Sequence, residues 1–243
     1  MNALRSMLFV QVFYPVGTLL TAVAVLESLF GQDAVIRGSR RWALWHRWCA
    51  RVILGISWDG VTHIDAQPAL YVFKHESMFE AIETLALFDR PIVVMKEELL
   101  RLPIWGTAAR KHGSIGVDRE AGATAMRAMM VAAKTAKASG RPIILFPEGT
   151  RTPHGQSPPL KAGLAGLYKM LRLPVIPVAV DAGRIWPHGI VKTPGKVHLK
   201  IGETIPPGLP REEVEARVHS AINALNCLPE TTQLSPTQID EIC

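Results

Sequence analysis

The sequence predicts an α/β protein with a largely parallel central sheet flanked by helices, preceded by an N-terminal helical segment that docks on a membrane. Two observations lead to this prediction. From about residue 69, short apolar runs alternate with helical stretches, as in strands joined by crossover helices. Ahead of this alternation, residues 6–26 contain no charged residue. We therefore expect a membrane-anchoring segment over residues 1–60, an α/β domain over residues 61–228 and a polar tail over residues 229–243.

The bulk composition limits the classes of protein to which the chain can belong. With 243 residues, it is long enough for one domain with a sizeable core. Its net charge of +6 favours an anionic partner, such as lipid headgroups, nucleotides or nucleic acid. Cys49, Cys227 and Cys243 lie far apart and indicate neither a disulfide framework nor a zinc site, which favours a reducing compartment.

The apolar stretch at residues 6–26 is long enough for a helix that crosses a bilayer core, which takes about 20 residues. Tyr14-Pro15-Val16-Gly17 interrupts its middle, so we expect a kink or two short membrane-embedded helices. One alternative is a buried core helix. A cleaved signal peptide is another, although no small-x-small site followed by a polar segment is present.

Residues 37–56 form a second and different segment. On a helix at about 100° per residue, its apolar and basic side chains fall on opposite sides. A basic, tryptophan-rich amphipathic helix suits a membrane interface, whereas the alternative is an ordinary surface helix packed on the domain. Together the two segments predict membrane association through residues 7–56, integral or tightly peripheral. The apolar side consists of Trp42, Trp45, Cys49, Val52, Ile53 and Ile56, and the basic side of Arg40, Arg47 and Arg51.

The alternation from residue 69 defines the elements of the α/β domain. Helical stretches between the apolar runs favour a parallel sheet with helices on its faces. The expected strands are residues 69–73, 92–95, 114–117, 143–146, 175–180 and 197–201. The expected helices are residues 78–88, 97–111, 120–139, 161–171 and 211–228.

The first candidate for chemistry is Lys74-His75-Glu76-Ser77-Met78-Phe79-Glu80, directly after the first strand. A histidine whose tautomer is fixed by a carboxylate can accept a proton at its other nitrogen. Residues five apart lie about 140° apart on a helix. The pair therefore requires His75 in the loop and Glu80 in the first turns of the next helix. His198 and Glu203 share this spacing, so the spacing alone does not identify a site.

The second candidate is the turn Pro147-Glu148-Gly149-Thr150-Arg151, which follows the apolar run 143–146. Such turns at the carboxyl edge of a sheet are where α/β proteins bind ligands. Glycine lets the backbone approach a ligand, and threonine and arginine offer donors suited to phosphate. The local alternative is a strand-to-loop junction in which Arg151 pairs with a surface carboxylate.

Two further cations accompany these segments. Arg119 stands at an expected helix start, where free N–H groups and the helix dipole favour phosphate. The local alternative is an ion pair with Asp118 or Glu120. Lys161 opens the helix after the 147–151 turn, either as another cation of the site or as an ordinary solvated lysine.

Other chemistries lack their motifs. Ser77 is not part of a Gly-x-Ser-x-Gly turn, which disfavours a serine hydrolase. The sequence has no His-Glu-x-x-His helix, no Walker loop and no dinucleotide fingerprint. Its arginines do not interleave with stacking aromatics, so we expect no nucleic-acid partner.

In chain order, four blocks resemble those of the 1-acylglycerol-3-phosphate (lysophosphatidate) acyltransferase family. They are His75-x4-Glu80, Gly113-x5-Arg119, Phe146-Pro-Glu-Gly-Thr-Arg151 and Val175-Ile-Pro-Val-Ala-Val180. The resemblance covers roughly residues 68–207, and Phe-Pro-Glu-Gly-Thr-Arg is its most specific block. It implies a glycerol-3-phosphate acyltransferase-like fold. The N-terminus is also similar to the membrane-docking region of bacterial members, which implies the cytoplasmic face of the inner membrane.

The resemblance implies acyl transfer from acyl-CoA or acyl carrier protein to the free hydroxyl of a lysophospholipid, forming phosphatidate in phospholipid biosynthesis. His75 would be the general base, oriented by Glu80. No metal or bound cofactor is implied, since positioning and oxyanion stabilisation can supply the rate. The implied substrate-binding residues are Arg119, Glu148, Gly149, Thr150 and Arg151, with Lys74, Lys161 and Pro177 as secondary candidates.

The roles of three positions, Lys74, Glu80 and Glu148, do not follow directly from the family pattern. The family typically carries Asn-His-x-Ser-x-x-Asp, whereas this chain has Lys74 and Glu80. Glu80 keeps the acceptor with one more methylene, and Lys74 would lower the pKa of His75 by like-charge repulsion. Glu148 would repel a phosphate, so we expect it to brace Arg151 or a substrate hydroxyl.

The same departures leave alternatives for the function. An acyltransferase acting on another lyso-lipid acceptor, such as lyso-ornithine lipid, is one alternative. A non-catalytic lipid-binding membrane protein is another, but it would leave the four ordered blocks unexplained.

Overall fold

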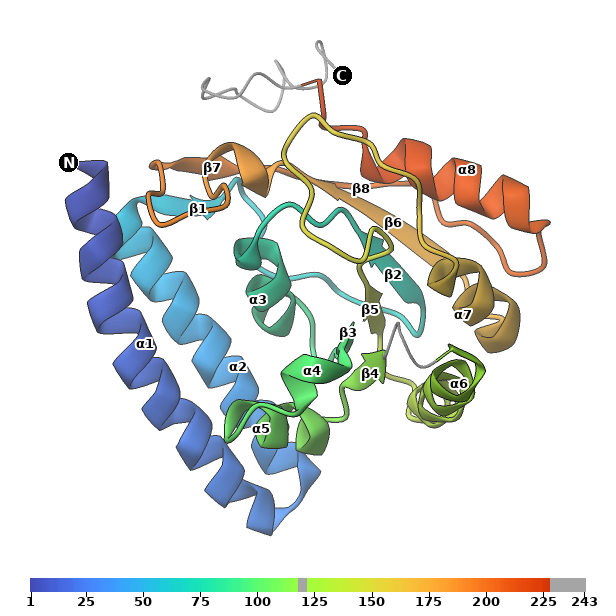
Figure 1. Cartoon of the computed structure of the whole chain (residues 1–243), viewed down its shortest axis with the longest axis horizontal. Coiled ribbons are helices and arrows are strands. Elements are labelled where there is room, and N and C mark those ends of the chain that lie inside the picture. Colours follow the sequence, from blue (N-terminus) through green and yellow to red (C-terminus); the bar gives the residue numbers. More distant parts are fainter. Residues whose placement is uncertain (118–121, 228–243) are drawn as a thin grey trace.

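The computed structural model describes residues 1–117 and 122–227, and a six-stranded sheet lies at the centre (Figure 1). The strand order is β4-β3-β5-β2-β6-β8. Every neighbouring pair is parallel except β6 and β8. The predicted α/β class with a largely parallel sheet is therefore confirmed.

The elements of this fold have the following bounds. The strands are β1 (Ile56–Trp58), β2 (Leu70–Phe73), β3 (Ile92–Lys96), β4 (Ile115–Val117), β5 (Ile143–Leu145), β6 (Val175–Val180), β7 (Gly195–Val197) and β8 (Leu199–Ile201). The helices are α1 (Asn2–Glu27), α2 (Gln32–Cys49), α3 (Met78–Leu87), α4 (Glu97–Leu100), α5 (Trp105–His112), α6 (Gly122–Ala138), α7 (Gly163–Leu171) and α8 (Arg211–Ile222).

The central strand β2 is buried on both faces, because alternate side chains of a strand point in opposite directions. Tyr71 and Phe73 join the apolar core shared with α1, α2 and α3. Leu70 and Val72 join the second core, shared with α6, α7 and α8. The sheet is thus the middle of three layers, and its helices divide into two sets.

Two expected elements are each divided in the structure. The helix expected at residues 97–111 is interrupted between α4 and α5, where Pro103 lacks an amide donor and restricts the residue before it. The strand expected at residues 197–201 is two strands. β7 pairs with β1 in a separate two-stranded sheet, and β8 pairs with β6. Between them the His198 N–H donates to Asp181 Oδ1 at 2.7 Å.

Helix α1 runs without interruption from Asn2 to Glu27 and contains Pro15, so the expected division into two short helices is wrong. Its Gly17 lies against Trp42 of α2, since a Cβ at Gly17 would stand 3.1 Å from Trp42 Nε1. Gly38 of α2 is approached even more closely, since a Cβ at Gly38 would stand 2.6 Å from the Ala24 Cβ of α1. These small residues let α1 and α2 pack as an antiparallel pair.

The segment Asn2–Phe30 is long and apolar enough to cross a membrane, by length and composition alone. Part of its surface packs on α2, through residues such as Phe9 and Phe13. Many large apolar side chains stay exposed: Leu4, Met7, Leu8, Val10, Tyr14, Val16, Leu19, Val23, Leu26, Leu29 and Phe30.

The second N-terminal segment ends earlier than expected. Helix α2 continues as a π-helical turn, Ala50–Leu54, which Gly55 ends at φ 72°, and Ile56 belongs to β1. One face of α2 packs on the domain, as the surface-helix alternative requires. Leu44, Trp48 and Val52, spaced four apart, remain exposed as an apolar stripe.

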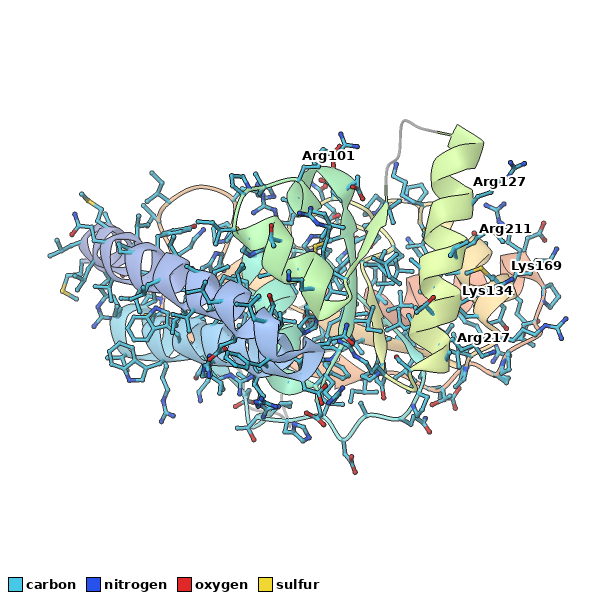
Figure 2. All side chains as sticks on the ribbon, turned by 90° about the horizontal axis from the view of Figure 1, so that it is seen from below. Arg101, Arg127, Lys134, Lys169, Arg211 and Arg217 are labelled. Carbon is cyan, nitrogen blue, oxygen red and sulfur yellow. The ribbon has the colours of Figure 1, made fainter. Side chains whose placement is uncertain are left out.

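Two remaining features concern charge and thiols. Basic side chains on α6, α7 and α8 gather at the end of the molecule away from α1 (Figure 2). They are Arg127, Lys134, Lys169, Arg211 and Arg217. Cys49 is a buried free thiol, whereas Cys227 is disulfide-bonded, which the cysteine spacing did not predict.

Candidate active site

The candidate site lies where the parallel strands β2, β5 and β6 end at one edge of the sheet. The chain leaves β2 as Lys74-His75 and leaves β5 as the 146–151 segment. The Thr152 N–H donates to the His75 carbonyl at 2.7 Å, which joins the two loops. Residues some seventy positions apart are thereby brought to one place.

His75 and Glu80 form the expected pair, with His75 Nδ1 3.0 Å from Glu80 Oε1. Glu80 Oε1 also accepts the N–H groups of Glu76 and Ser77, at 2.9 and 2.7 Å. Its Oε2 accepts the Ser77 hydroxyl at 2.6 Å. Ser77 and Glu80 form the capping box that begins α3, so the start of the helix also fixes the carboxylate.

The second imidazole nitrogen of His75 is available for chemistry. Because Nδ1–H donates to the carboxylate, Nε2 carries the lone pair. Nε2 has no hydrogen-bond partner in the part of the chain that the structure describes, and the side chain is 18% exposed. The Phe146 ring lies against the imidazole, with 4.4 Å between ring centroids. The geometry is that of an oriented and accessible proton acceptor.

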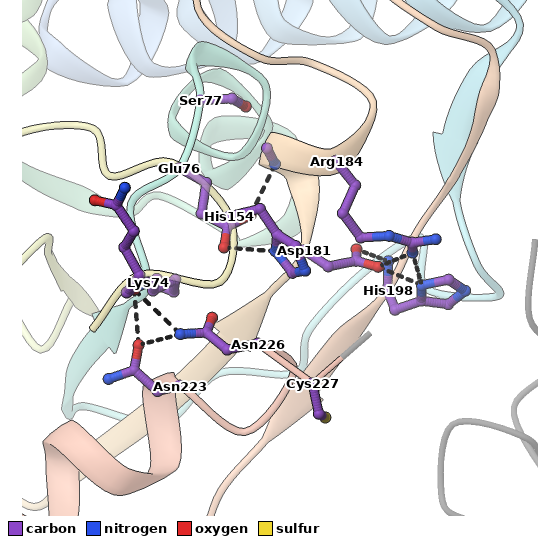
Figure 3. A network of polar contacts seen from close by, with 12 residues as sticks. Lys74, Glu76, Ser77, His154, Asp181, Arg184, His198, Asn223, Asn226 and Cys227 are labelled. Carbon is purple, nitrogen blue, oxygen red and sulfur yellow. Dashed lines mark hydrogen bonds and ion pairs between the residues drawn. The ribbon is translucent and has the colours of Figure 1, made fainter. Parts of the chain in front are cut away.

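Lys74 does not act on His75 in the way the sequence suggested. Its ammonium group donates to Glu148 Oε1 and to the Gln156 carbonyl, at 2.7 and 2.6 Å. It also donates to Asn223 Oδ1 at 2.7 Å (Figure 3). The Lys74 side chain is completely buried, and its charge is neutralised by Glu148. The geometry therefore gives no support to like-charge repulsion of the imidazole.

Both carboxylate oxygens of Glu148 accept hydrogen bonds from within the chain. One oxygen binds Lys74, and the other accepts the His75 N–H at 2.8 Å. The residue is buried, and it makes no ion pair with Arg151 in the described ranges. Glu148 braces the His75 loop, a role that the sequence did not indicate.

The 147–151 segment is a tight turn closed by backbone hydrogen bonds. Gly149 adopts φ 71°, a left-handed conformation that favours glycine. The turn is held by bonds from the Gly149 N–H to the Phe146 carbonyl and from the Lys161 N–H to the Pro147 carbonyl. Arg151 has no carboxylate partner over residues 1–117 and 122–227, so the surface ion pair weighed as its alternative is not formed there.

A second cation that the sequence did not single out stands near Arg151. Burial lowers the pKa of Lys192 to about 8, and the Arg151 guanidinium contributes to this effect. The Lys192 ammonium donates to the carbonyls of Pro187 and Gly189, at 2.7 and 2.6 Å. Two cations that destabilise each other mark a region where an anion would be favoured.

The remaining candidates lie in different places. Arg119 lies outside the described residues, as does the tail predicted at 229–243. Lys161 is exposed beside the turn. Pro177 lies inside β6, in register with Val72, so it is part of the sheet interior. Within the described ranges, no three histidine, cysteine or acidic side chains gather in a group that could hold a metal.

The second pair at five-residue spacing is not formed. His198 Nδ1 lies 2.6 Å from Asp181 Oδ2 and does not pair with Glu203. His154 pairs with Glu76 at 3.0 Å, and burial raises the pKa of Glu76 above its ordinary value. Neither contact had a local signal, because the partners are far apart in the sequence.

This arrangement defines an α/β protein with an oriented base beside a cationic turn at the carboxyl edge of its sheet. The chain belongs to the acyltransferase family, whose sequence profile matches residues 56–181. The match contains both the His75 pair and the 147–151 turn.

Individual relatives agree with this family. The chain is 32% identical over 166 residues to a 1-acyl-sn-glycerol-3-phosphate acyltransferase of Pseudomonas aeruginosa, covering 67% of this chain and 65% of the relative. It is 27% identical to the human 1-acyl-sn-glycerol-3-phosphate acyltransferase beta, over 66% of this chain and 59% of that protein. The matched region thus spans less than two thirds of either relative.

The fold is also that of a solved structure. The crystal structure of the 1-acyl-sn-glycerophosphate (LPA) acyltransferase from Thermotoga maritima superposes with a TM-score of 0.71 and 23% identity. The superposition covers 92% of this chain and 95% of that one, so it includes the N-terminal helices as well as the sheet.

Proposed function

We propose that this protein transfers an acyl chain from a thioester donor, acyl-CoA or acyl carrier protein, to the free hydroxyl of 1-acylglycerol-3-phosphate, forming phosphatidate. The observation that carries this proposal is the His75–Glu80 pair, which lies at the same sheet edge as Arg151. Among the described residues, neither His75 Nε2 nor the Arg151 guanidinium has a partner that would block it. The names of the similar proteins support the choice of acceptor.

The reaction needs one base and no acyl-enzyme. His75 Nε2 takes the proton of the acceptor hydroxyl while that oxygen attacks the thioester carbonyl carbon. Glu80 stabilises the imidazolium that forms. The tetrahedral intermediate then collapses, the new C–O bond remains, the C–S bond breaks, and the imidazolium returns its proton to the thiolate. The Lys74–Glu148 pair holds the His75 backbone during these steps.

The phosphate of the acceptor would lie beside Arg151. The guanidinium is free to bind it, and Lys192 adds positive charge nearby. The Gly149 N–H is held by the Phe146 carbonyl, so the Thr150 N–H would be the backbone donor of the turn, and the absence of a side chain at Gly149 lets the ligand approach it. Arg119 and Lys161 are further cations proposed for this side of the site.

We further propose that the protein works on a membrane. Its acceptor is a lipid, and α1 with the turn after it leaves apolar side chains such as Leu19, Leu29 and Phe30 exposed. The exposed stripe Leu44, Trp48 and Val52, on α2 and the π-helical turn that follows it, would add contact with the membrane. The location that fits is the cytoplasmic face of a bacterial inner membrane.

The test is an acyl-transfer assay on the purified full chain with several lyso-acceptors and both donor types, followed by mass spectrometry of the products. We expect phosphatidate from lysophosphatidate and little product from an acceptor that lacks phosphate. His75→Ala should lower kcat by about a thousandfold, since general-base catalysis contributes on the order of 10²–10⁴.

Two outcomes would contradict the proposal. Preferred acylation of lyso-ornithine lipid would assign the same chemistry to another acceptor. Binding to vesicles with no turnover on any acceptor would point to a non-catalytic lipid-binding protein. Circular dichroism of His75→Ala serves as the control for folding.

A further inference from the structure

We propose that the C-terminal end of α8 is a working part of this site, and that Asn223 and Lys74 are positioning residues for the His75 base. The proposal rests on the function proposed above. Asn223 lies outside the family match at residues 56–181, and no sequence motif points to it.

The Lys74 ammonium is the centre of the arrangement. An ammonium group has three N–H donors and no acceptor. In this structure its three acceptors come from three separate segments, namely Glu148 of the turn, Gln156 of the following loop and Asn223 at the end of α8. A buried charge is tolerated only when it is paired and hydrogen-bonded, so the three segments must stay in place around Nζ.

Asn223 is oriented to accept from Lys74. It is the C-cap residue of α8, and its Nδ2 donates to the His219 carbonyl at 2.7 Å. This bond identifies Oδ1 as the atom that faces the ammonium. Asn226 Nδ2 donates to the same oxygen at 3.0 Å, which holds the amide in this orientation. Figure 3 shows both amides approaching Lys74 from the α8 side.

Lys74 is in turn linked to the base through one carboxylate. Glu148 accepts from Lys74 with Oε1 and from the His75 N–H with Oε2, at 2.7 and 2.8 Å. A displaced ammonium would therefore shift Glu148, and with it the backbone that places the imidazole. Buried polar networks are rigid when every member is satisfied and weak when one is missing. The sequence separation of Lys74 and Asn223 is 149 residues, so the link couples distant parts of the chain.

The first experiment removes the acceptor of Asn223 while keeping the number and branching of its side-chain heavy atoms, in Asn223→Leu. We expect kcat with lysophosphatidate to fall about tenfold or more, since misplacing a reacting group by about 1 Å can cost 100-fold. The KM for lysophosphatidate should stay within about twofold, because Asn223 does not touch the acceptor. The matched control is His219→Leu, which removes a 3.2 Å contact from the same helix to Ser157 but none to Lys74.

The second experiment separates positioning from folding. Lys74→Met combined with Glu148→Gln removes both buried charges together, which costs less stability than leaving one of them unpaired. We expect this double variant to fold, with a higher unfolding temperature than Lys74→Met alone, and to keep a low kcat. A wild-type kcat in this folded variant would overturn the proposal, as would equal losses in Asn223→Leu and His219→Leu.

A third experiment does not depend on catalytic activity, so it tests the link from Asn223 to His75 separately from the proposed function. Amide hydrogen exchange over residues 74–77 should be faster in Asn223→Leu, by about tenfold, and unchanged in His219→Leu. If the wild type does not acylate lysophosphatidate, the proposed function fails while the exchange result still decides the link from Asn223 to His75. Unchanged exchange in Asn223→Leu would refute that link.

Discussion

Two carboxylates of α3 each bind a histidine, and comparing the two pairs shows what distinguishes a candidate catalytic pair from a structural contact. Glu80 and Glu83 lie three residues apart on α3, and both side chains are completely buried. Each lies 3.0 Å from a histidine Nδ1, Glu80 from His75 and Glu83 from His46. The pairs have the same distance and the same partner types, yet they stand in different surroundings.

The difference lies in the second nitrogen of each imidazole. His75 is 18% exposed at the sheet edge, whereas His46 is fully buried and its Nε2 has no hydrogen-bond partner among residues 1–117 and 122–227. Aromatic rings of Phe13, Phe79 and Trp186 surround His46 at centroid distances of 5.3 to 5.7 Å. Orientation of the imidazole by a carboxylate is thus common to both pairs, and access to Nε2 is what distinguishes His75, the proposed base, from His46.

Of the substitutions that compare the two carboxylates, Glu80→Gln should have the largest effect on kcat. The amide keeps the size of the carboxylate and can still accept from the His75 ring, but it cannot stabilise an imidazolium. We expect kcat to fall about 100-fold or more, with an unfolding temperature close to that of the wild type because the helix cap is largely retained. Steady-state kinetics and thermal unfolding measure the two quantities. A kcat within twofold of wild type would remove Glu80 from the mechanism.

The sequence was sufficient for the elements that depend on local pattern. The run Val175–Val180 is apolar throughout, as expected of a strand buried on both faces, and β6 has these bounds. The predicted strand boundaries were wrong where a tertiary contact determines them. At His198, for example, the N–H donates to the Asp181 side chain and separates β7 from β8. Pro15 indicated an interruption of the N-terminal helix, whereas α1 is continuous and packs closely against α2. The sequence around Pro15 gives no sign of this packing.

The candidate site divides in the same way. The contact of His75 with Glu80 was predictable, because Ser77-x-x-Glu80 is a capping-box pattern that places the carboxylate at the helix start. The role of Glu148 was not, because its partner Lys74 lies 74 residues away and no local pattern indicates which residues fold against a turn. For the same reason, neither the contact of Asn223 with Lys74 nor the His46–Glu83 pair could be predicted from the sequence.

The next prediction applies the same substitution to the other carboxylate, in Glu83→Gln. Glu83 accepts from Arg47 Nε and Trp58 Nε1 at 2.7 and 2.9 Å, in addition to its contact with His46. Removing the charge leaves Arg47 without its ion-pair partner, so unfolding should become easier by about 3 kcal/mol. Below the new unfolding temperature, kcat should stay within about twofold of wild type, which urea unfolding and kinetics together can check. A large loss of kcat in folded protein would show that the two pairs are not separate in role.

The smallest effect concerns the pH dependence of stability. Burial raises the pKa of Glu83, but His46 and Arg47 outweigh it, so the pKa lies below the ordinary value of 4.5. A carboxyl with a lowered folded-state pKa stabilises the protein above pH 4.5, and this stabilisation is lost as pH falls through the folded-state pKa. The stability difference between wild type and Glu83→Gln should therefore narrow as the pH is lowered below 4.5.

For Glu76, the expected dependence of stability on pH has the opposite sign. Burial is the main cause that raises its pKa above 4.5, so its stabilising contribution is present at lower pH and is lost as pH rises through the folded-state value. Glu76→Gln does not titrate and should gain stability relative to wild type as pH rises, while Glu83→Gln loses it. Urea unfolding at a series of pH values on both sides of 4.5 measures both differences. If the two differences moved in the same direction with pH, environment would not be what separates these two buried carboxylates.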